Sequence, residues 1–362
     1  MLEDTEFEKK IKPKFNKFIL TEPINGQLGN QMYRFASLYA IGKLLNRTPV
    51  YIQQDNYIKN IEVELSKIFP NFFKQIYFLK SEFKIQKKFQ LATTCCDYNN
   101  PKILLKENNA KILRLIGGIY FESYKYFDHL REEILNLFEF GPEIVKEIEE
   151  ATQKIYFLND YSRKICVHTR FGDFVGFGES VIEQVEALIG LIPKLLFRLI
   201  KRNVIDKRYS LLIFGEDKNF LNQIKINKNK FLFNKIYHVL DFSLSRGGEL
   251  YFAKEYCDAL FLTAPLSSFA FWMGYLMPNI RFDDLIHNFR IPSITKIEKT
   301  RVLNYDNLPI FYIRKQLLLH PSKTTIYPFD TMQILPKDWF PIEENWLENK
   351  KKIKEKNKNF IF

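Results

Sequence analysis

A glycine-rich segment near the start of the chain, Gly26 to Gln31 (GQLGNQ), has the residue types that hold an anionic or sugar ligand. Its two glycines stand between an expected strand and an expected helix. Backbone amides at such a turn, Gly29 included, can approach a phosphate or a sugar closely, and a helix N-terminus favours negative charge. Asn30 and Gln31 add hydrogen-bonding side chains. The alternative is a plain strand-to-helix turn with Asn30 as the N-cap.

A basic segment, His168 to Phe174 (HTRFGDF), follows a short β-rich run. The C-terminal ends of parallel strands are where open α/β sheets bind ligands. Arg170 offers a planar, bidentate grip on a diphosphate, Gly172 permits a tight turn, and Asp173 can orient Arg170 or accept from a nucleotide. The alternatives are a core histidine at His168 and a surface ion pair between Arg170 and Asp173.

Two further segments are expected at strand ends. In Pro265–Trp272 (PLSSFAFW), Ser267 and Ser268 at a helix start suit a phosphate, with Phe269 beside them; ordinary N-capping is the alternative. Glu216 and Asp217 follow Gly215 and rim the same edge, although a solvated turn with acids at a helix start is the favoured interpretation there.

A transfer reaction also needs a general base within reach of the attacking hydroxyl. Glu179 follows the arginine loop, and Glu122 follows the Gly117–Gly118 turn. Both are weak candidates, because solvated surface acids have the same sequence pattern.

Strand-like and helix-like segments alternate in the second half, which predicts βαβ units and parallel sheets. The predicted strands there are 164–169, 209–215, 235–241 and 258–263, and the helices are 180–202 (broken near Pro193), 216–223, 246–256 and 267–276. In the first half we expect strands at 18–24, 49–53 and 111–116, and helices at 30–45, 124–138 and 142–154. The predicted domains are an N-terminal segment 1–17, a Rossmann-like domain 18–159, a second Rossmann-like domain 160–292 and an extension 293–362 with a lysine-rich tail.

Composition narrows the possible classes. Hydrophobic residues make up 46% of the 362 residues, which excludes disorder for the bulk of the chain. The net charge of +12 allows nucleic acid as a partner, but six lysines against two glutamates lie in residues 347–362 and the rest of the charge is diffuse. We therefore expect no nucleic-acid partner.

The four cysteines form no CxxC pair, and the adjacent Cys95 and Cys96 are poorly placed to bridge each other. Neither a zinc site nor a disulfide framework is predicted. The uncharged run 259–280 is long enough to span a bilayer, but Pro265 divides it into an expected strand and an expected helix. Since residues 1–17 also lack an apolar signal region, the chain is expected to be soluble as given.

The order of these segments resembles glycosyltransferase family 11, the α-1,2-fucosyltransferases, and especially its divergent nematode-type branch. Five segments of the family have counterparts here. They are GGLGNQM at 26–32, GYFQS-and-YF at 118–127, HxRRGDY at 168–174, FSDD at 214–217 and C-D-x-(6)-S-x-S-T-F-x-W-W at 257–272. The resemblance spans residues 18 to 280.

That resemblance implies a GT-B-like fold with two facing Rossmann-like domains, the second binding the donor and the first lying on the acceptor side. It implies inverting transfer of L-fucose from GDP-fucose to a glycan hydroxyl, with galactose and an α-1,2 linkage as the expected acceptor and product. No cofactor or metal is expected, and the Golgi is the implied location. Arg170 would grip the diphosphate, and His168 would shape the nucleotide pocket. Asp173 would hold the loop or the nucleoside.

The remaining roles concern the rest of the donor. Ser267, Ser268 and Phe269 would line its phosphates, and Asn30 and Gln31 would face the fucose.

The sequence departs from the family pattern at three places: Phe171 replaces an arginine, Asn25 replaces a glycine, and Ser268 replaces a threonine. Losing one charge-assisted contact is worth about 1.5–3 kcal/mol. A catalytically degenerate nucleotide-sugar- or glycan-binding protein on the same fold is therefore the alternative to an active enzyme.

Overall fold

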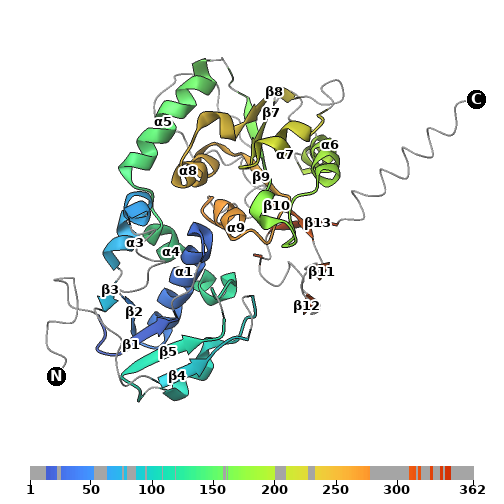
Figure 1. Ribbon diagram of the computed structural model, residues 1–362. Coiled ribbons are helices and arrows are strands. Elements are labelled where there is room, and N and C mark those ends of the chain that lie inside the picture. Colours follow the sequence, from blue (N-terminus) through green and yellow to red (C-terminus); the bar gives the residue numbers. More distant parts are fainter. Residues whose placement is uncertain are drawn as a thin grey trace, which may run out of the picture. The chain divides into compact units, whose positions relative to one another are not determined.

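The computed structural model describes two compact α/β units (Figure 1). The described residues are 14–22, 26–52, 63–75, 77–79, 87–93, 96–107, 109–118, 120–157, 160, 162–199, 209–226, 233–277, 310–314, 317–318, 327–328, 335–336 and 339–343. The first unit comprises residues 1–146 and 333–335, and the second comprises 147–332 and 336–362. The division falls within helix α5 (Pro142–Phe157), upstream of the predicted boundary. Asn25, Cys95, Asn159 and the lysine-rich tail lie outside the described residues.

The first unit contains a five-stranded parallel sheet in the order β3-β2-β1-β5-β4. Its strands are β1 (Phe18–Thr21), β2 (Thr48–Ile52), β3 (Tyr77–Leu79), β4 (Lys87–Gln90) and β5 (Ile112–Ile116). The chain runs outward from β1 to β3 and then returns to place β5 on the other side of β1. The strand order therefore reverses between β1 and β5, and such a switch point opens a crevice at the C-terminal ends of the two strands.

Helix α1 (Leu28–Leu44) packs on β1 and β2 and is buried on most of its circumference. Residues that are apolar on several faces of a helix indicate such a buried position. The helix begins two residues earlier than predicted, and Gln27 rather than Asn30 occupies the N-cap position. The amide groups of Gly29 and Asn30 thus belong to the first turn.

The predicted helix 124–138 is only partly helical. It consists of two 3-10 turns, η2 (Tyr124–Tyr126) and η3 (Asp128–Leu130), before helix α4 (Arg131–Leu137) begins. The hydroxyl of Tyr126 hydrogen-bonds Asn99 and Asp97, and the Phe127 ring is fully buried. These tertiary contacts outweigh the local helical pattern. The unit also contains α3 (Pro70–Gln75) and η1 (Pro101–Glu107).

The second unit contains a six-stranded parallel sheet in the order β13-β10-β9-β6-β7-β8. Its strands are β6 (Arg163–His168), β7 (Tyr209–Phe214), β8 (Phe233–His238), β9 (Ala259–Leu262), β10 (Ile310–Arg314) and β13 (Phe340–Glu343). Two parts of the predicted extension 293–362 therefore add strands to this sheet. Strands β11 (Leu317–Leu318) and β12 (Tyr327–Pro328) form a separate antiparallel pair.

Four helices accompany the second sheet: α6 (Ile182–Leu199), α7 (Lys218–Gln223), α8 (Arg246–Tyr256) and α9 (Ser268–Tyr275). Helix α6 continues through Pro193, where a break was predicted. Its inward face carries Val185, Leu188 and Ile192 in the main core cluster with Ile165. This burial offsets the roughly 3 kcal/mol that an internal proline costs a helix.

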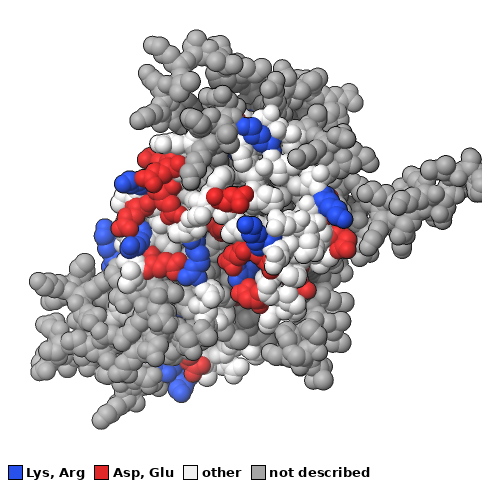
Figure 2. All heavy atoms as spheres, turned by 45° about the horizontal axis from the view of Figure 1, so that its top comes forward, with Lys and Arg blue, Asp and Glu red and all other residues white. Residues whose placement is uncertain are grey.

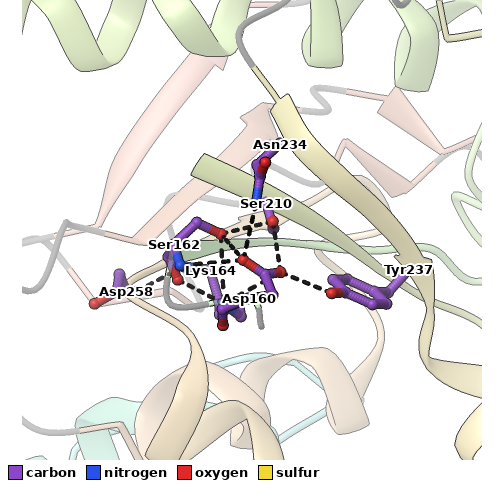
Figure 3. A network of polar contacts seen from close by, with 7 residues as sticks. All are labelled: Asp160, Ser162, Lys164, Ser210, Asn234, Tyr237 and Asp258. Atoms are coloured by element: carbon purple, nitrogen blue, oxygen red, sulfur yellow. Dashed lines mark hydrogen bonds and ion pairs between the residues drawn. The ribbon is translucent and has the colours of Figure 1, made fainter. Parts of the chain in front are cut away.

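A buried carboxylate closes the other end of the second sheet, at the N-terminal ends of β6, β7 and β8 (Figure 3). Asp160 is fully buried and accepts hydrogen bonds from Ser210 and Tyr237, both at 2.8 Å, and its Oδ2 lies 3.4 Å from Lys164 Nζ. Burial alone would raise the pKa of Asp160, but these hydrogen bonds and those from Ser162 hold it below its usual range. The network is fully satisfied, as a buried charge requires.

A disulfide bond joins Cys166, in the middle of β6, to Cys257, two residues before the start of β9. Both cysteines are buried, and their Cα atoms are 5.7 Å apart. The sequence did not indicate a disulfide framework, and the structure corrects this interpretation. Cys96 is also disulfide-bonded. Spacing along the chain gave no signal, because the pair is separated by 91 residues and meets only through the β6–β9 pairing.

The uncharged run 259–280 forms β9 and then α9, as predicted from Pro265. Among the described residues, no helix combines the length and apolar character needed to cross a bilayer.

Candidate functional site

The strand order of the second unit brings three of the predicted segments to one edge. The chain runs outward from β6 through β7 to β8, and then returns to place β9 on the other side of β6. The order therefore reverses between β6 and β9. Arg170 follows β6, Glu216 follows β7 and Ser267 follows β9, so all three stand at the C-terminal edge where this fold binds ligands.

Arg170 is the central side chain of this edge. It is only 16% exposed, and its guanidinium pairs with Asp173 and with Glu216, each at 2.9 Å. The two carboxylates are 62% and 64% exposed. Ion pairs with such exposed acids contribute little in water, so a more highly charged anion can compete for the guanidinium.

A chain of hydrogen bonds fixes the backbone beneath Arg170. The Arg170 amide donates to Ser180 Oγ at 2.8 Å, Ser180 Oγ shares a hydrogen bond with Thr263 Oγ1 at 2.6 Å, and Thr263 donates to the His168 carbonyl at 2.9 Å. Thr169 Oγ1 donates to the Phe214 carbonyl at 2.7 Å. The arginine loop is thus tied to both neighbouring strands. The sequence analysis missed Ser180 and Thr263, since lone hydroxyls carry no motif.

His168 ends β6 and is buried, with its ring centroid 6.2 Å from that of Phe269. Burial lowers the pKa of His168 to about 3, and the positive charge of Arg170 acts in the same direction. The imidazole is therefore neutral. Among the described residues its Nδ1 has no hydrogen-bond partner, which is unusual for a buried polar atom.

The remaining predicted residues of this edge have local structural roles as well. Asp217 caps α7 by accepting from the Phe220 amide, and Ser267 caps α9 by accepting from the Ala270 amide. Ser268 is the first residue of α9. Gly172 has φ +62°, and a Cβ atom at this position would have Asp217 Oδ2, 3.9 Å away, as its nearest neighbour. The N-capping alternative therefore holds for Ser267, whose own amide donates to the Ala264 carbonyl at 3.0 Å.

A carboxyl group that the sequence analysis did not single out belongs to the same electrostatic environment. Glu249 lies in the first turn of α8. Burial raises its pKa to about 7, and the negative charges of Glu216 and Glu147 also raise it, against the opposing effect of Arg170. Its charge consequently changes near neutral pH, beside the side chain predicted to hold a diphosphate.

Phe171, which replaces the family's second arginine, stacks on Phe220 of α7 with ring centroids 4.7 Å apart. Its side chain is 38% exposed. The replacement thus substitutes an aromatic contact for a cation next to Arg170.

The predicted residues of the first unit lie at its own switch point, between β1 and β5. Gly29 is buried, and Asn30 is half-buried and donates to Glu122 Oε1 at 2.6 Å. Gln31 is fully buried, and its Oε1 accepts from Arg34 at 3.3 Å. The structure therefore brings Asn30 together with Glu122 and turns Gln31 inward. In the second unit, Glu179 accepts a hydrogen bond from the Gly176 amide at 2.9 Å, a contact that orders its loop.

Charge on the described part of the face in Figure 2 is mixed rather than gathered into a stripe. Figure 2 shows acidic and basic side chains interspersed on the face it presents. Among the described residues, no group of three His, Cys, Asp or Glu side chains is placed to hold a metal ion. Among the described residues of the β6 edge, Arg170 and the N-terminus of α9 are the positive elements.

No protein-family model matches the chain. A candidate galactoside 2-alpha-L-fucosyltransferase of Caenorhabditis elegans, svh-11, is 28% identical over 270 residues, which cover 69% of this chain and 66% of that protein. A second C. elegans protein, named galactoside 2-alpha-L-fucosyltransferase, is 26% identical over 70% of this chain and 67% of its own length. A third of that name is 23% identical over 70% of this chain. The matched segment spans about two thirds of these curated relatives.

The solved structures that match the chain include NodZ alpha-1,6-fucosyltransferase co-crystallized with GDP, at TM-score 0.43 and 14% identity over 72% of this chain and 93% of that one. POFUT1 in complex with GDP-fucose gives a TM-score of 0.42 and 12% identity over 74% and 95%. The predicted fold class, α/β with two parallel sheets in separate units, is confirmed by the structure itself. The sequence comparisons confirm the resemblance to the divergent nematode-type branch of the α-1,2-fucosyltransferase family.

Proposed function

We propose that the chain is an inverting, metal-independent fucosyltransferase. It moves L-fucose from GDP-fucose to a hydroxyl of a glycan acceptor, with terminal galactose and an α-1,2 linkage as the preferred case. The names of the C. elegans relatives support the donor sugar and the galactoside acceptor. The observation that carries the proposal is the position of Arg170 at the β6–β9 switch point, where it is mostly buried and pairs, among the described residues, with two exposed carboxylates.

The reaction is an in-line displacement at the anomeric carbon of fucose. The acceptor oxygen bonds that carbon, the bond to the β-phosphate oxygen breaks, and GDP leaves with the bonding electrons. Negative charge grows on the departing diphosphate, so a fixed cation beside it lowers the barrier. Arg170 supplies this cation, the amides of Ser268 and Phe269 in the first turn of α9 add partial positive charge, and neutral His168 lines the nucleotide side without adding charge.

Binding of GDP tests the donor site before any acceptor is known. Calorimetric titration in excess EDTA should show metal-free binding by the natural chain and about 10- to 100-fold weaker binding by Arg170→Ala, as expected for one lost charge-assisted contact. The matched control is Arg163→Ala, at the opposite end of the same strand, which should bind GDP normally. Equal binding by the natural chain and Arg170→Ala would exclude this diphosphate site.

A second variant separates a diphosphate grip from a structural ion pair. Glu216→Gln removes one of the two carboxylates that compete for Arg170. It should strengthen GDP binding by up to about fivefold, since an exposed ion pair contributes about 0–1 kcal/mol. Weaker binding by Glu216→Gln would show that the pair holds the loop in place.

The second candidate function is a binding protein that retains the donor site without turnover. Phe171 favours it, because this side chain removes a cation at the position next to Arg170. GDP binding without release of fucose to methyl β-galactoside or to water would support the binding protein over the enzyme.

A further inference from the structure

Helix α8 brings a further carboxyl group to the C-terminal edge of the second sheet. The helix returns the chain from the end of β8 to the start of β9, so its N-terminus lies at this edge. The ring of Phe252 packs against that of Phe214, the last residue of β7, with ring centroids 6.1 Å apart. Glu249 lies three residues before Phe252, on the same face of the helix and one turn closer to the edge. Its carboxyl group therefore belongs beside the loop that follows β7 and carries Glu216.

Another carboxylate already occupies the N-terminus of α8. Glu147 of α5 accepts hydrogen bonds from the amide of Ser245 at 2.5 Å and from the hydroxyl of Ser245 at 2.7 Å. The same carboxylate lies against Gly248, where a Cβ atom would clash with Glu147 Oε1. The positive end of the helix dipole thus faces Glu147, and it gives less stabilisation to a second acid in the same turn.

Several elements surround the carboxyl group of Glu249, and their charges are unbalanced. Helix α9 packs on α8 and has no charged residue among its eight. The other neighbouring elements carry these charged or titratable residues: Glu147 in α5, Arg170 after β6, Glu216 after β7, His238 at the end of β8, Asp241 in η6 (Val239–Phe242) and Arg246 in α8 itself. Acids outnumber arginines in this set, and a bound diphosphate would add more negative charge.

Burial distinguishes Glu249 from the two acids that pair with Arg170. Asp173 and Glu216 are 62% and 64% exposed, so water solvates their charges and their side chains can move away from the guanidinium. Glu249 is half-buried in the first turn of a helix. Burial and two nearby carboxylates raise the pKa of Glu249 to about 7, against the opposing effect of Arg170. Glu249 is thus the acid of this edge that most readily becomes neutral when negative charge arrives.

We propose that donor binding is coupled to the uptake of a proton by Glu249. The proposal rests on the proposed diphosphate site at Arg170, which lies in the same unit. When the diphosphate binds, its negative charge strengthens the hold of Glu249 on a proton, and the carboxylate takes a proton from water and becomes neutral. When GDP leaves after the transfer, the carboxyl group returns the proton to water. Because such coupling is reciprocal, protonated Glu249 favours donor binding and a rising pH favours the release of GDP.

Calorimetric titration of the full chain with GDP in two buffers counts this proton. Tris and HEPES absorb different amounts of heat when they give up a proton, so the difference between the two binding enthalpies gives the number of protons taken up per GDP. At pH 8 the terminal phosphate of GDP is already ionised and contributes little. If the diphosphate raises the pKa of Glu249 from about 7 by about one pH unit, the uptake is about 0.4 proton at pH 8 and about 0.1 proton at pH 9.

Three variants assign the proton to one residue. Glu249→Gln keeps the size and polarity of the side chain but cannot titrate, so it should bind GDP without proton uptake at pH 8. The matched control is Glu255→Gln in the last turn of the same helix, whose carboxylate pairs with Lys254 at 3.0 Å, and it should keep the full uptake. His238→Asn removes the imidazole that ends β8 and should also keep it. The fall in uptake between pH 8 and pH 9 is measured on the natural chain, so it tests the coupling even if a variant does not fold.

The outcomes separate the coupled proton from the site on which it rests. GDP binding without proton uptake at pH 8 would overturn the coupling and leave the diphosphate site intact. Equal uptake by the natural chain and Glu249→Gln would overturn the assignment to Glu249, and loss of uptake in His238→Asn alone would move the proton to the imidazole. A folded natural chain that does not bind GDP would overturn both the coupling and the diphosphate site.

Discussion

The disulfide between Cys166 and Cys257 makes a strong prediction about stability, because it closes a loop of 91 residues. In the chain-entropy treatment, a cross-link over a loop of that length removes about 15.5 cal/mol/K from the unfolded ensemble, which corresponds to about 4.6 kcal/mol at 25 °C. Replacing both cysteines by alanine should therefore lower the free energy of unfolding of the second unit by about 4 kcal/mol. That loss is a large part of the stability of an ordinary domain.

Tryptophan fluorescence during urea unfolding measures this loss in the relevant unit, because Trp272 and Trp339 both belong to it and are buried there. The natural chain and the Cys166→Ala/Cys257→Ala variant are compared at the same pH, with circular dichroism as the control that the variant folds. Alkylation of the unfolded natural chain without reductant supplies an independent check, since neither cysteine should react. Reaction at Cys166, or a stability difference below about 1 kcal/mol, would refute the bond and the entropy argument with it.

Three further predictions concern the two switch points. Lowering the pH through about 7 should strengthen GDP binding, because protonation of Glu249 removes a negative charge beside Arg170. The Glu249→Gln variant should bind GDP more tightly than the natural chain at pH 8, and its GDP affinity should no longer change with pH through 7. Phe171→Arg should tighten GDP binding by about tenfold in calorimetry, the effect of one restored charge-assisted contact, and unchanged affinity would mean that the position faces away from the diphosphate. Gly117→Ala should destabilise the first unit by more than about 2 kcal/mol in urea unfolding, because φ of Gly117 is +100° and the new Cβ would lie 2.0 Å from a backbone oxygen. The control Gly172→Ala, whose new Cβ would have open space around it, should lower the free energy of unfolding of the second unit by about 1 kcal/mol.

The strand–helix alternation of the second half was predicted well from the sequence, because its strands are continuous apolar runs that end at clear turns. Strands β10 and β13 were missed. They lie in residues 293–362, where no alternation with helices continues the pattern, and they join the sheet only through pairing with β9 and with each other. The break predicted at Pro193 was wrong for a similar reason. Local preference indicated a helix end, and packing of the apolar face against the sheet decided otherwise.

Residue type and strand position predicted Arg170, Asp173 and Glu216 as one group, and the ion pairs connect them. The orientation of neighbouring helical residues was beyond that reasoning. Asn30 and Gln31 were assigned the same role, yet one contacts Glu122 and the other turns inward to Arg34. Adjacent positions on a helix differ by about 100°, so one residue of such a pair is commonly buried when the other reaches an edge.

The order of the motifs along the chain has a topological cause. Each unit begins with a strand whose following loop carries one motif, namely 26–31 after β1 and 168–174 after β6. Each unit later returns to the first strand's open side, with β5 just before segment 118–127 and with β9 inside segment 257–272. Reversal of the strand order therefore pairs motifs that lie some 90 residues apart in sequence.

The same topology explains why acids accompany both edges. Strand β7 adjoins β6 on its other side, so Glu216 reaches Arg170 from the outer flank, while Glu122 reaches Asn30 across the reversal itself. At the β6 edge Glu216 pairs with the guanidinium of Arg170, for which a diphosphate can compete. At the β1 edge the acid has no cation among the described residues, and its proton affinity rises instead.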